Sequence, residues 1–330
     1  MLSYRCPVTS CSNHGAVFPY ESAQKLDFKC FICDNELEDP TPNLEPIIDA
    51  MDQIPTTLKI LPRLRRLVKA EDTNISSIAD LISKDALLSV GIIKIGNSSF
   101  YSGMGHCNTV EEALNRVGFT ETYKFIGIAA SSSILLEELK AYNLSPHDLW
   151  RNSLLVATLT EVLSKNLLKS PIRKEYTLPE TSVSYMVGLL HSIGKIVIEN
   201  YLNTIGRGLD AILTDETESL VLGYTNPDVA AILLRKWNFS DELTAPIRFQ
   251  NEPGIHNNNP LSIILHVAKL LAPQLTADKF KDSFTLDDFT VDNDLLVKIG
   301  ATEDDLIDII TDCYQDFLAM AKEFKGNQHL

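Results

Sequence analysis

Four of the six cysteines lie within the first 33 residues, in two close pairs: Cys6 with Cys11, and Cys30 with Cys33. Each short spacer lets two thiolates face one ion, and two such pairs complete the tetrahedral four-thiolate shell that zinc prefers. We therefore predict a structural zinc ion held by all four cysteines. His14 is close enough in sequence to compete as a ligand, and buried metal-free thiols or a redox pair are the alternatives. A closed shell has no open coordination position, so this zinc implies no catalysis.

The segment that carries these cysteines, residues 1–39, is too small for a core of its own. Between the pairs it carries the apolar or aromatic side chains of Val17, Phe18, Tyr20 and Phe28, which suffice for a small β-hairpin but not for a stable core. Modules below about 40 residues usually need a staple such as a metal, and structural zinc supplies ~10–16 kcal/mol of apparent binding energy in finger peptides. The arrangement resembles a zinc ribbon, so we expect the metal to be part of the fold.

Zinc ribbons often contact nucleic acid, but the charge of this module favours a protein partner. Residues 1–39 hold three basic and six acidic side chains. The whole chain of 330 residues has 29 Lys and Arg against 44 Asp and Glu, a net charge of −15. Nucleic acid and anionic membranes are therefore disfavoured as partners.

The composition is that of an ordinary globular chain, with 45% hydrophobic and 22% charged residues, which excludes disorder. No stretch reaches the roughly 18 consecutive apolar residues of a membrane helix, and residues 1–12 lack a basic region followed by an apolar core. We therefore expect a cytoplasmic protein. In that reducing compartment, clustered cysteines indicate metal binding rather than disulfides.

Helical periodicity dominates the chain after residue 53. Pro40, Pro42 and Pro46 mark residues 40–53 as a linker, and no alternating strand pattern persists beyond it. We therefore expect a mainly α chain with an all-α domain over residues 54–325.

Several helices are predicted from apolar rows and caps. Thr73 or Asn74 is a candidate N-cap for the first row, and Thr302 with Asp305 has capping-box spacing before the last row. The two rows are Ile75, Ile78, Ala79 and Ile82, and Leu306, Ile309, Ile310, Cys313 and Phe317. Further helices are predicted from Val110, Trp150, Val183, Pro227 and Pro260.

Two segments have strongly one-sided charge. Residues 282–312 hold ten acids and one lysine, whereas one predicted helix carries Lys59, Arg63, Arg65, Arg66 and Lys69. Each is read first as a solvated face, and the two could complement one another.

The helical region resembles the HDOD domain, a signalling relative of the HD phosphohydrolases. Several motifs carry the resemblance in the family's order. They are IPTTLKILPRLRRLV (residues 54–68), IGNSSFY (95–101), TVEEALNRVGF (109–119), LLHSIGKIVI (189–198) and LGYTNPDVAAILLRKW (222–237). The resemblance implies an HD-like multi-helix fold over some 270 residues and a role in bacterial signal transduction.

The same resemblance implies that the metal ligands of an HD hydrolase are mostly lost. Such an enzyme needs metal ions held by His and Asp, because a bound cation lowers the pKa of water and polarises a phosphoryl oxygen. His191 is the one strong ligand left among the aligned positions, whereas the others are Asn152, Ser192, Asn226, Gln250, Asn251 and Lys269. Neutral amides bind metals weakly, and Lys269 would put a cation where a metal belongs.

His191 has two interpretations. It is either a core histidine hydrogen-bonded to backbone or to Ser192, or part of a degenerate pocket in which Lys269 could pair with an anionic small ligand. Lys195 is expected to be solvated or to complement the helix dipole. The pocket set is Asn152, His191, Ser192, Asn226 and Lys269.

These observations lead to one hypothesis and two alternatives. We expect a non-enzymatic regulatory protein that binds a signalling protein partner. A divergent HD-type metal-dependent phosphohydrolase or phosphodiesterase that uses His191 is the first alternative. Nucleic-acid binding through the ribbon is the second, and the acidity of the chain argues against it.

Overall fold

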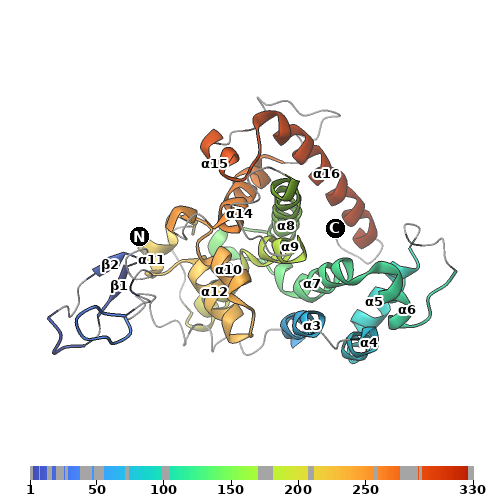
Figure 1. The fold of residues 1–330 in the computed structure, drawn as a ribbon, viewed down its shortest axis with the longest axis horizontal. Helices are drawn as coiled ribbons and strands as arrows, with labels where there is room; N and C mark the ends of the chain where they lie inside the picture. Colours follow the sequence, from blue (N-terminus) through green and yellow to red (C-terminus); the bar gives the residue numbers. More distant parts are fainter. Residues whose placement is uncertain are drawn as a thin grey trace.

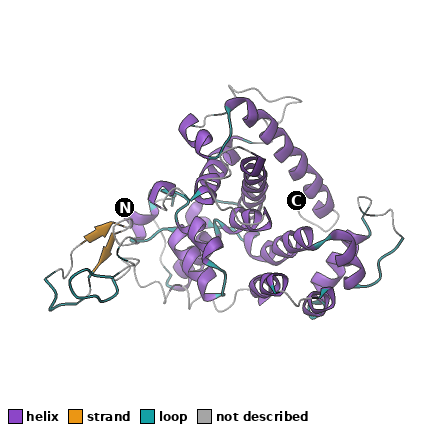
Figure 2. Ribbon diagram, in the orientation of Figure 1, coloured by secondary structure: helices purple, strands orange, loops and turns teal. Residues whose placement is uncertain are grey.

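The computed structural model is dominated by α-helices (Figures 1 and 2). It describes residues 3–6, 8–12, 17–19, 26, 29–37, 47, 56–70, 74–98, 101, 105–169, 181–206, 212–255, 259–275, 289 and 292–325. The first helices are η1 (Thr56–Lys59), α3 (Ile60–Lys69), α4 (Ile75–Ile82), α5 (Ala86–Gly96), α6 (Val110–Val117), α7 (Phe119–Leu135) and η3 (Lys140–Tyr142). They are followed by α8 (Pro146–Lys169), α9 (Thr181–Leu190), α10 (Ile193–Thr204), α11 (Glu218–Leu222), α12 (Asn226–Lys236) and α13 (Asp241–Arg248). The last are η5 (Pro253–Ile255), α14 (Pro260–Leu271), η6 (Ala272–Gln274), α15 (Asn293–Lys298) and α16 (Glu303–Lys325).

The cysteine-rich segment contains the only strands among the described residues. β1 (Ser3–Arg5) pairs antiparallel with β2 (Val17–Pro19), with Ser3 opposite Pro19. The predicted hairpin lay between the two cysteine pairs, whereas these strands lie on either side of the first pair. The strand pair therefore brackets Cys6 and Cys11, at the opposite end of the view from α4 to α6 (Figure 1).

The core of the helical part is built around α8 and α9, which pack along each other (Figure 1). α14 and α16 also pack on α8, while α12 contacts both α10 and α13. The contact between α8 and α9 is close because Gly188 has no side chain: a Cβ there would lie 2.5 Å from Ala157 Cα. Of the predicted linker, residues 40–53, the structure describes only Ile47, which is buried against this core.

The predicted helices are confirmed, and three of the five named starts agree to within one residue: α6 begins at Val110, α12 at Asn226 and α14 at Pro260, whereas α8 begins at Pro146 and α9 at Thr181. Asn74 caps α4, its side chain accepting a hydrogen bond from Ser77 N at 2.8 Å; Thr73, the other candidate, lies outside the described residues. Asp305 N donates to Thr302 Oγ1 at 3.2 Å and Thr302 N donates to Asp305 Oδ2 at 2.8 Å, a capping box with Asp in the place of Glu. The apolar row that ends α16, including Cys313, is buried.

One apolar stretch, Thr181–Thr204, is long enough to cross a membrane, but 89% of its most apolar window is buried. It comprises α9 and α10, which are separated at His191 and Ser192. Its hydropathy is accounted for by its place in the core, since an interior helix is apolar on every side.

Candidate functional site

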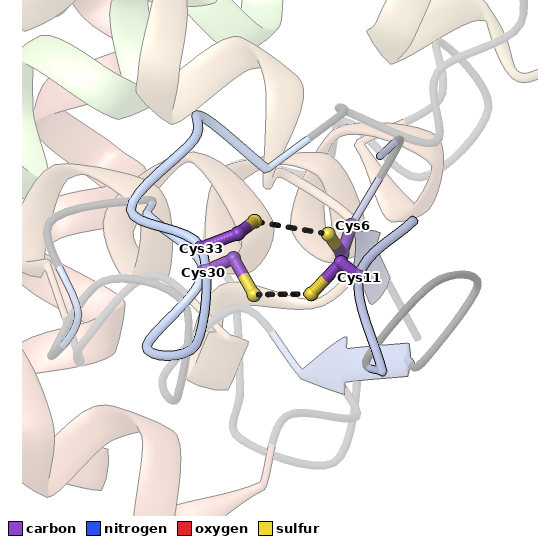
Figure 3. A group of neighbouring side chains, drawn as sticks. All are labelled: Cys6, Cys11, Cys30 and Cys33. Carbon is purple, nitrogen blue, oxygen red and sulfur yellow. Dashed lines mark hydrogen bonds between the residues drawn. The ribbon is translucent and has the colours of Figure 1, made fainter. Parts of the chain in front are cut away.

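The four cysteines meet in space although 18 residues separate the two pairs (Figure 3). The four sulfur atoms lie within 4.8 Å of one another. Cys6 Sγ is 3.6 Å from Cys33 Sγ, and Cys11 Sγ is 3.8 Å from Cys30 Sγ. A disulfide would need about 2.05 Å, whereas a tetrahedral zinc ion with Zn–S bonds of about 2.3 Å puts neighbouring sulfurs about 3.8 Å apart. The tetrad could therefore hold a metal ion, and zinc is the ion that its geometry and ligand type favour.

The turn after Cys30 shapes half of this tetrad. Asp34 N donates to Cys30 O and Cys30 N donates to Asn35 O, both at 2.8 Å. Asp34 takes a left-handed conformation with a φ of 56°, which Asp tolerates better than most residues. A hydrogen bond from the backbone of Asn35 lowers the pKa of Cys33, which favours the metal-binding thiolate. His14, the alternative ligand, lies outside the described residues.

A second site is a polar cavity of about 350 Å³ in the helical part. Asn152 comes from α8, His191 and Ser192 from the break between α9 and α10, Asn226 from the start of α12, and Lys269 from α14. All five members of the predicted pocket set, up to 117 positions apart in sequence, thus line one space.

The centre of the cavity is an ion-pair triad that sequence reasoning missed. Asp215 Oδ1 lies 2.8 Å from Lys195 Nζ, and Asp215 Oδ2 lies 2.9 Å from Lys269 Nζ. Burial alone would raise the pKa of Asp215, but the two ammonium groups outweigh it and hold the pKa well below the usual range. The sequence predicts that Lys195 is solvated or complements a helix dipole; in the structure, only 19% of its side chain is exposed and its ammonium lies over the Tyr142 ring. Two ammonium groups share one carboxylate, which leaves one net positive charge.

Beside the triad, Asn226 is fixed by a buried carboxylate. Asn226 N donates to Glu218 Oε2 at 2.6 Å, and Asn226 Nδ2 donates to both Glu218 oxygens at 3.1 Å. The hydroxyl of Tyr142 donates to Glu218 Oε1 at 2.9 Å. Because neutral donors hold both oxygens, burial remains the main influence on Glu218 and raises its pKa. Glu218 is therefore a structural carboxylate in this arrangement.

His191 is both a core residue and a lining residue. Its side chain is 3% exposed, and Nδ1 lies 2.7 Å from Gly188 O. Because a carbonyl oxygen only accepts, Nδ1 carries the proton and the neutral ring keeps a lone pair on Nε2. Burial, together with the charge of Lys269, lowers the pKa of His191 to about 3, so the ring is neutral at physiological pH. The hydrogen bond of Nδ1 to the backbone agrees with the first interpretation of His191, that of a core histidine. Ser192, the other partner considered for it, is instead paired with Ser153, with 3.2 Å between the two hydroxyl oxygens.

The two remaining positions aligned with lost ligands support the cavity from outside. Gln250 is fully buried, and its Nε2 donates to His191 O at 2.9 Å and to Ile247 O at 2.8 Å. Asn251 accepts a short hydrogen bond from Lys269 through Oδ1. Gln250 therefore holds the backbone at the break before α10, while Asn251 helps to hold the ammonium of Lys269.

The described cavity residues are not arranged like the cysteine tetrad. Within the part of the chain that the structure describes, the cysteine tetrad is the only group of three or more His, Cys, Asp or Glu side chains placed to hold one ion. In the cavity, His191 lies among two ammonium groups and the carboxylates of Asp148, Asp215 and Glu216. Hydrolysis by metal-bound hydroxide requires a cation at such a site, and the ammonium groups of Lys195 and Lys269 would repel one.

The pKa of His191 gives a prediction for stability. An unfolded histidine has a pKa of about 6.5, so between pH 6.5 and about 3 the unfolded chain binds one proton more than the native chain at this residue. Its contribution is present above pH 6.5 and is lost as the pH falls toward 3, by at most about 1.4 kcal/mol per pH unit. In urea unfolding at pH 7, 6 and 5, the difference between the native sequence and His191→Gln should shrink as the pH falls. Parallel pH profiles would contradict a neutral buried ring.

Solved structures share this fold at low sequence identity. A protein of Marinobacter aquaeolei VT8, provisionally named as a signal transduction protein, superposes with a TM-score of 0.60, at 22% identity over 86% of this chain and 61% of that one. Two proteins of Shewanella amazonensis SB2B are similar as well. One is provisionally named as a phosphohydrolase (TM-score 0.57, 22% identity, 86% of this chain and 96% of that one) and the other as a metal-dependent phosphohydrolase (0.54, 19%, 84% and 95%).

Sequence comparison gives the family. An uncharacterized protein of Treponema pallidum (strain Nichols) is 22% identical over 220 residues, which is 65% of this chain and 39% of that protein. The match thus spans about two fifths of the length of this curated relative. The pattern of the HDOD domain matches residues 54–253, which include all of the cavity residues except Lys269 and Pro273. The chain belongs to the HDOD domain family.

Proposed function

We propose that this chain is a non-enzymatic regulatory protein that acts in bacterial signal transduction by binding a protein partner in the cytoplasm. The observation that carries the proposal is the triad of Lys195, Asp215 and Lys269 in the cavity. Its two ammonium groups bring positive charge into the space where a hydrolase of this superfamily would bring metal ions, and Asp215 joins them as a bridging carboxylate joins two cations.

The energetics favour this triad over bound metal. A divalent cation at His191 Nε2 would have to replace or repel the ammonium of Lys269, which is only 16% exposed and already bonded to Asp215 and Asn251. Like charges at short range in a partly buried site are strongly unfavourable. An anionic small ligand would have to compete with the carboxylate of Asp215, which already pairs with both ammonium groups. A protein partner is therefore the better proposal for the binding activity.

The cysteine-rich segment, residues 1–39, offers a surface for that partner. Between Cys30 and Cys33, the side chains of Phe31 and Ile32 are 65% and 51% exposed, although both are large and apolar. The metal that we propose at the tetrad would hold this turn rigid, so two apolar side chains are presented with little entropy left to lose on binding. Aromatic and aliphatic side chains of this kind are common anchors in protein interfaces.

This docking role can be tested by affinity capture with the full-length protein. A Phe31→Ser, Ile32→Ser variant should keep its zinc and lose the partner that the native sequence captures. The control is Leu87→Ser, which removes an even more exposed apolar side chain (85%) from α5 and should keep the partner. A partner held equally by both variants, or none captured by the native sequence, would contradict docking through this turn.

A divergent metal-dependent phosphohydrolase is the second candidate, and one observation favours it. His191 is neutral and donates Nδ1–H to a backbone carbonyl, which is the arrangement of a metal-ligating histidine. The candidate predicts hydrolysis of cyclic dinucleotides or nucleoside phosphates, with added manganese or iron, that disappears in His191→Ala. The regulatory proposal predicts no His191-dependent hydrolysis.

A further inference from the structure

A row of basic side chains on the first helices has no acidic partner in the described chain. Lys59, Arg63 and Arg66 are exposed and follow one another at i, i+4 and i+7 from η1 into α3. None of the three takes part in an ion pair with a described residue, whereas Arg65 and Lys69, on the neighbouring face, both pair with Glu242. In a chain of net charge −15, three unpaired basic groups in a line are unusual. The row is about 10.5 Å long, from a rise of about 1.5 Å per residue.

A row of acids with matching spacing lies on α16. Asp305, Asp308 and Asp312 follow one another at i, i+3 and i+7, and the last two are exposed without an ion pair to any described residue. Asp305 accepts hydrogen bonds from Thr302 and keeps its negative charge, because those bonds lower its pKa. This row also extends over about 10.5 Å.

The two rows match when the helices run antiparallel. Lys59 then faces Asp312, Arg63 faces Asp308, and Arg66 faces Asp305. When the basic row is followed forwards and the acidic row backwards along the chain, both step by four residues and then by three. Successive residues of a helix are about 100° apart around its axis, so the three side chains of each row spread over only about 60° and share one face. Helices that pack 8–10 Å apart bring a long basic side chain to a short carboxylate across the interface.

One molecule cannot make this contact itself. α3 and α16 lie on different sides of the bundle (Figure 1), and the basic row makes no ion pair with α16. We propose that the basic row of one copy docks antiparallel on the acidic row of a second copy, so that this chain self-associates through α3 and α16. Two copies related by a twofold axis make the contact twice and form a closed dimer. With any other rotation, each copy keeps one row free, so further copies add until a ring closes or a filament forms.

The net charge of the chain makes the salt dependence distinctive. At 0.01 M salt the screening length is about 30 Å, so two copies of charge −15 repel as whole bodies. At about 0.1 M it falls to about 10 Å, which screens the whole-body repulsion but not the contacting rows, and at 1 M it is about 3 Å. Self-association should therefore be strongest near 0.1 M and lost at both extremes. Apolar association would instead persist or strengthen in high salt.

Charge exchange between the rows tests the proposal directly. In sedimentation velocity of the full chain near 0.1 M salt, Lys59→Glu with Arg63→Glu, and separately Asp308→Lys with Asp312→Lys, should each weaken self-association at least tenfold. An equimolar mixture of the two variants should associate again, because each supplies the row that the other lacks. These four side chains are exposed and the cap residue Asp305 is left in place, so heat unfolding of each variant should match the native chain.

A control separates the rows from net charge. Lys84→Glu with Lys140→Glu changes the net charge by the same amount as the basic-row variant, at two exposed positions outside the rows, and should leave self-association unchanged. The proposal is overturned if the native chain stays monomeric near 0.1 M salt, if the mixture does not associate, or if the control loses association as well. Binding of the basic row to an acidic protein or to nucleic acid, with no self-association, would equally overturn it.

Discussion

Removal of the zinc ion that we propose at the cysteine tetrad should unfold the cysteine-rich segment, residues 1–39, and leave the helical bundle folded. Among the described residues of the segment 1–39, the buried cluster is Cys6, Cys11, Cys30 and Leu37, with Val8, Leu26 and Cys33 packed against it. Three of the four are ligands, so little apolar burial remains once the metal leaves. Structural zinc supplies ~10–16 kcal/mol of apparent binding energy in finger peptides, far more than a cluster of this size could offer.

The measurement combines metal content with hydrogen exchange. The purified chain should carry about one zinc, and a chelator or Cys30→Ser should abolish protection in the cysteine segment but not in α8 and α9. Cys107→Ala removes a buried thiol outside the tetrad and should keep the zinc. A chain without bound zinc, or a module that stays protected after chelation, would contradict the four-thiolate assignment.

A methyl group at Gly194 should have the second largest effect. At this position α10 approaches α12 at backbone distance: a Cβ would strike the carbonyl oxygen of Asn226, 2.8 Å from its carbon and 3.0 Å from Ala230 N. Backbone atoms at the start of a helix cannot move aside as a flexible side chain can. We expect Gly194→Ala to lower the free energy of unfolding by about 3 kcal/mol or more, and to disturb the cavity because Asn226 lines it.

Urea unfolding checks this expectation. Gly254→Ala is the matched control, since a Cβ there would meet nothing within 4 Å and its φ is not positive. The control should unfold within about 0.5 kcal/mol of the native chain. If Gly194→Ala is as stable as Gly254→Ala, the close packing of α10 on α12 is wrong.

Much of the fold could be predicted because its signals are local. The caps at Asn74 and Thr302 and the buried row of α16 follow from short-range rules about helix ends and apolar spacing. The cysteine pairs likewise limited the tetrad to a few geometries. The strand register was not predictable in the same way, because β1 is three residues long and lies outside the segment that looked like a hairpin.

The cavity shows where sequence reasoning ends. The motifs placed Asn152, His191 and Lys269 near one another, but nothing local distinguishes Asp215 from its acidic neighbours Glu216 and Glu218. Tertiary packing alone separates them: Asp215 bridges two ammonium groups, Glu218 is buried against Asn226, and Glu216 is exposed at the rim. A buried lysine implies a nearby carboxylate on physical grounds, although not which one.

The Lys195–Asp215–Lys269 triad also changes the interpretation of Lys195, the lysine of the LLHSIGKIVI motif. From the sequence alone, Lys195 is expected to be solvated or to complement the helix dipole, because the helix continues past it. In the structure its ammonium is held by Asp215 and lies 5.2 Å from the centre of the Tyr142 ring. Both lysines thus bring an ammonium group into the cavity, where Asp215 pairs with both.

Anomalous scattering from crystals grown with excess manganese and zinc tests this account most directly, because it locates each metal by element. We predict one zinc ion at Cys6, Cys11, Cys30 and Cys33, and no metal ion in the cavity beside His191. A divalent cation bound to His191 Nε2, with Lys269 displaced from Asp215, would contradict the account and favour the phosphohydrolase.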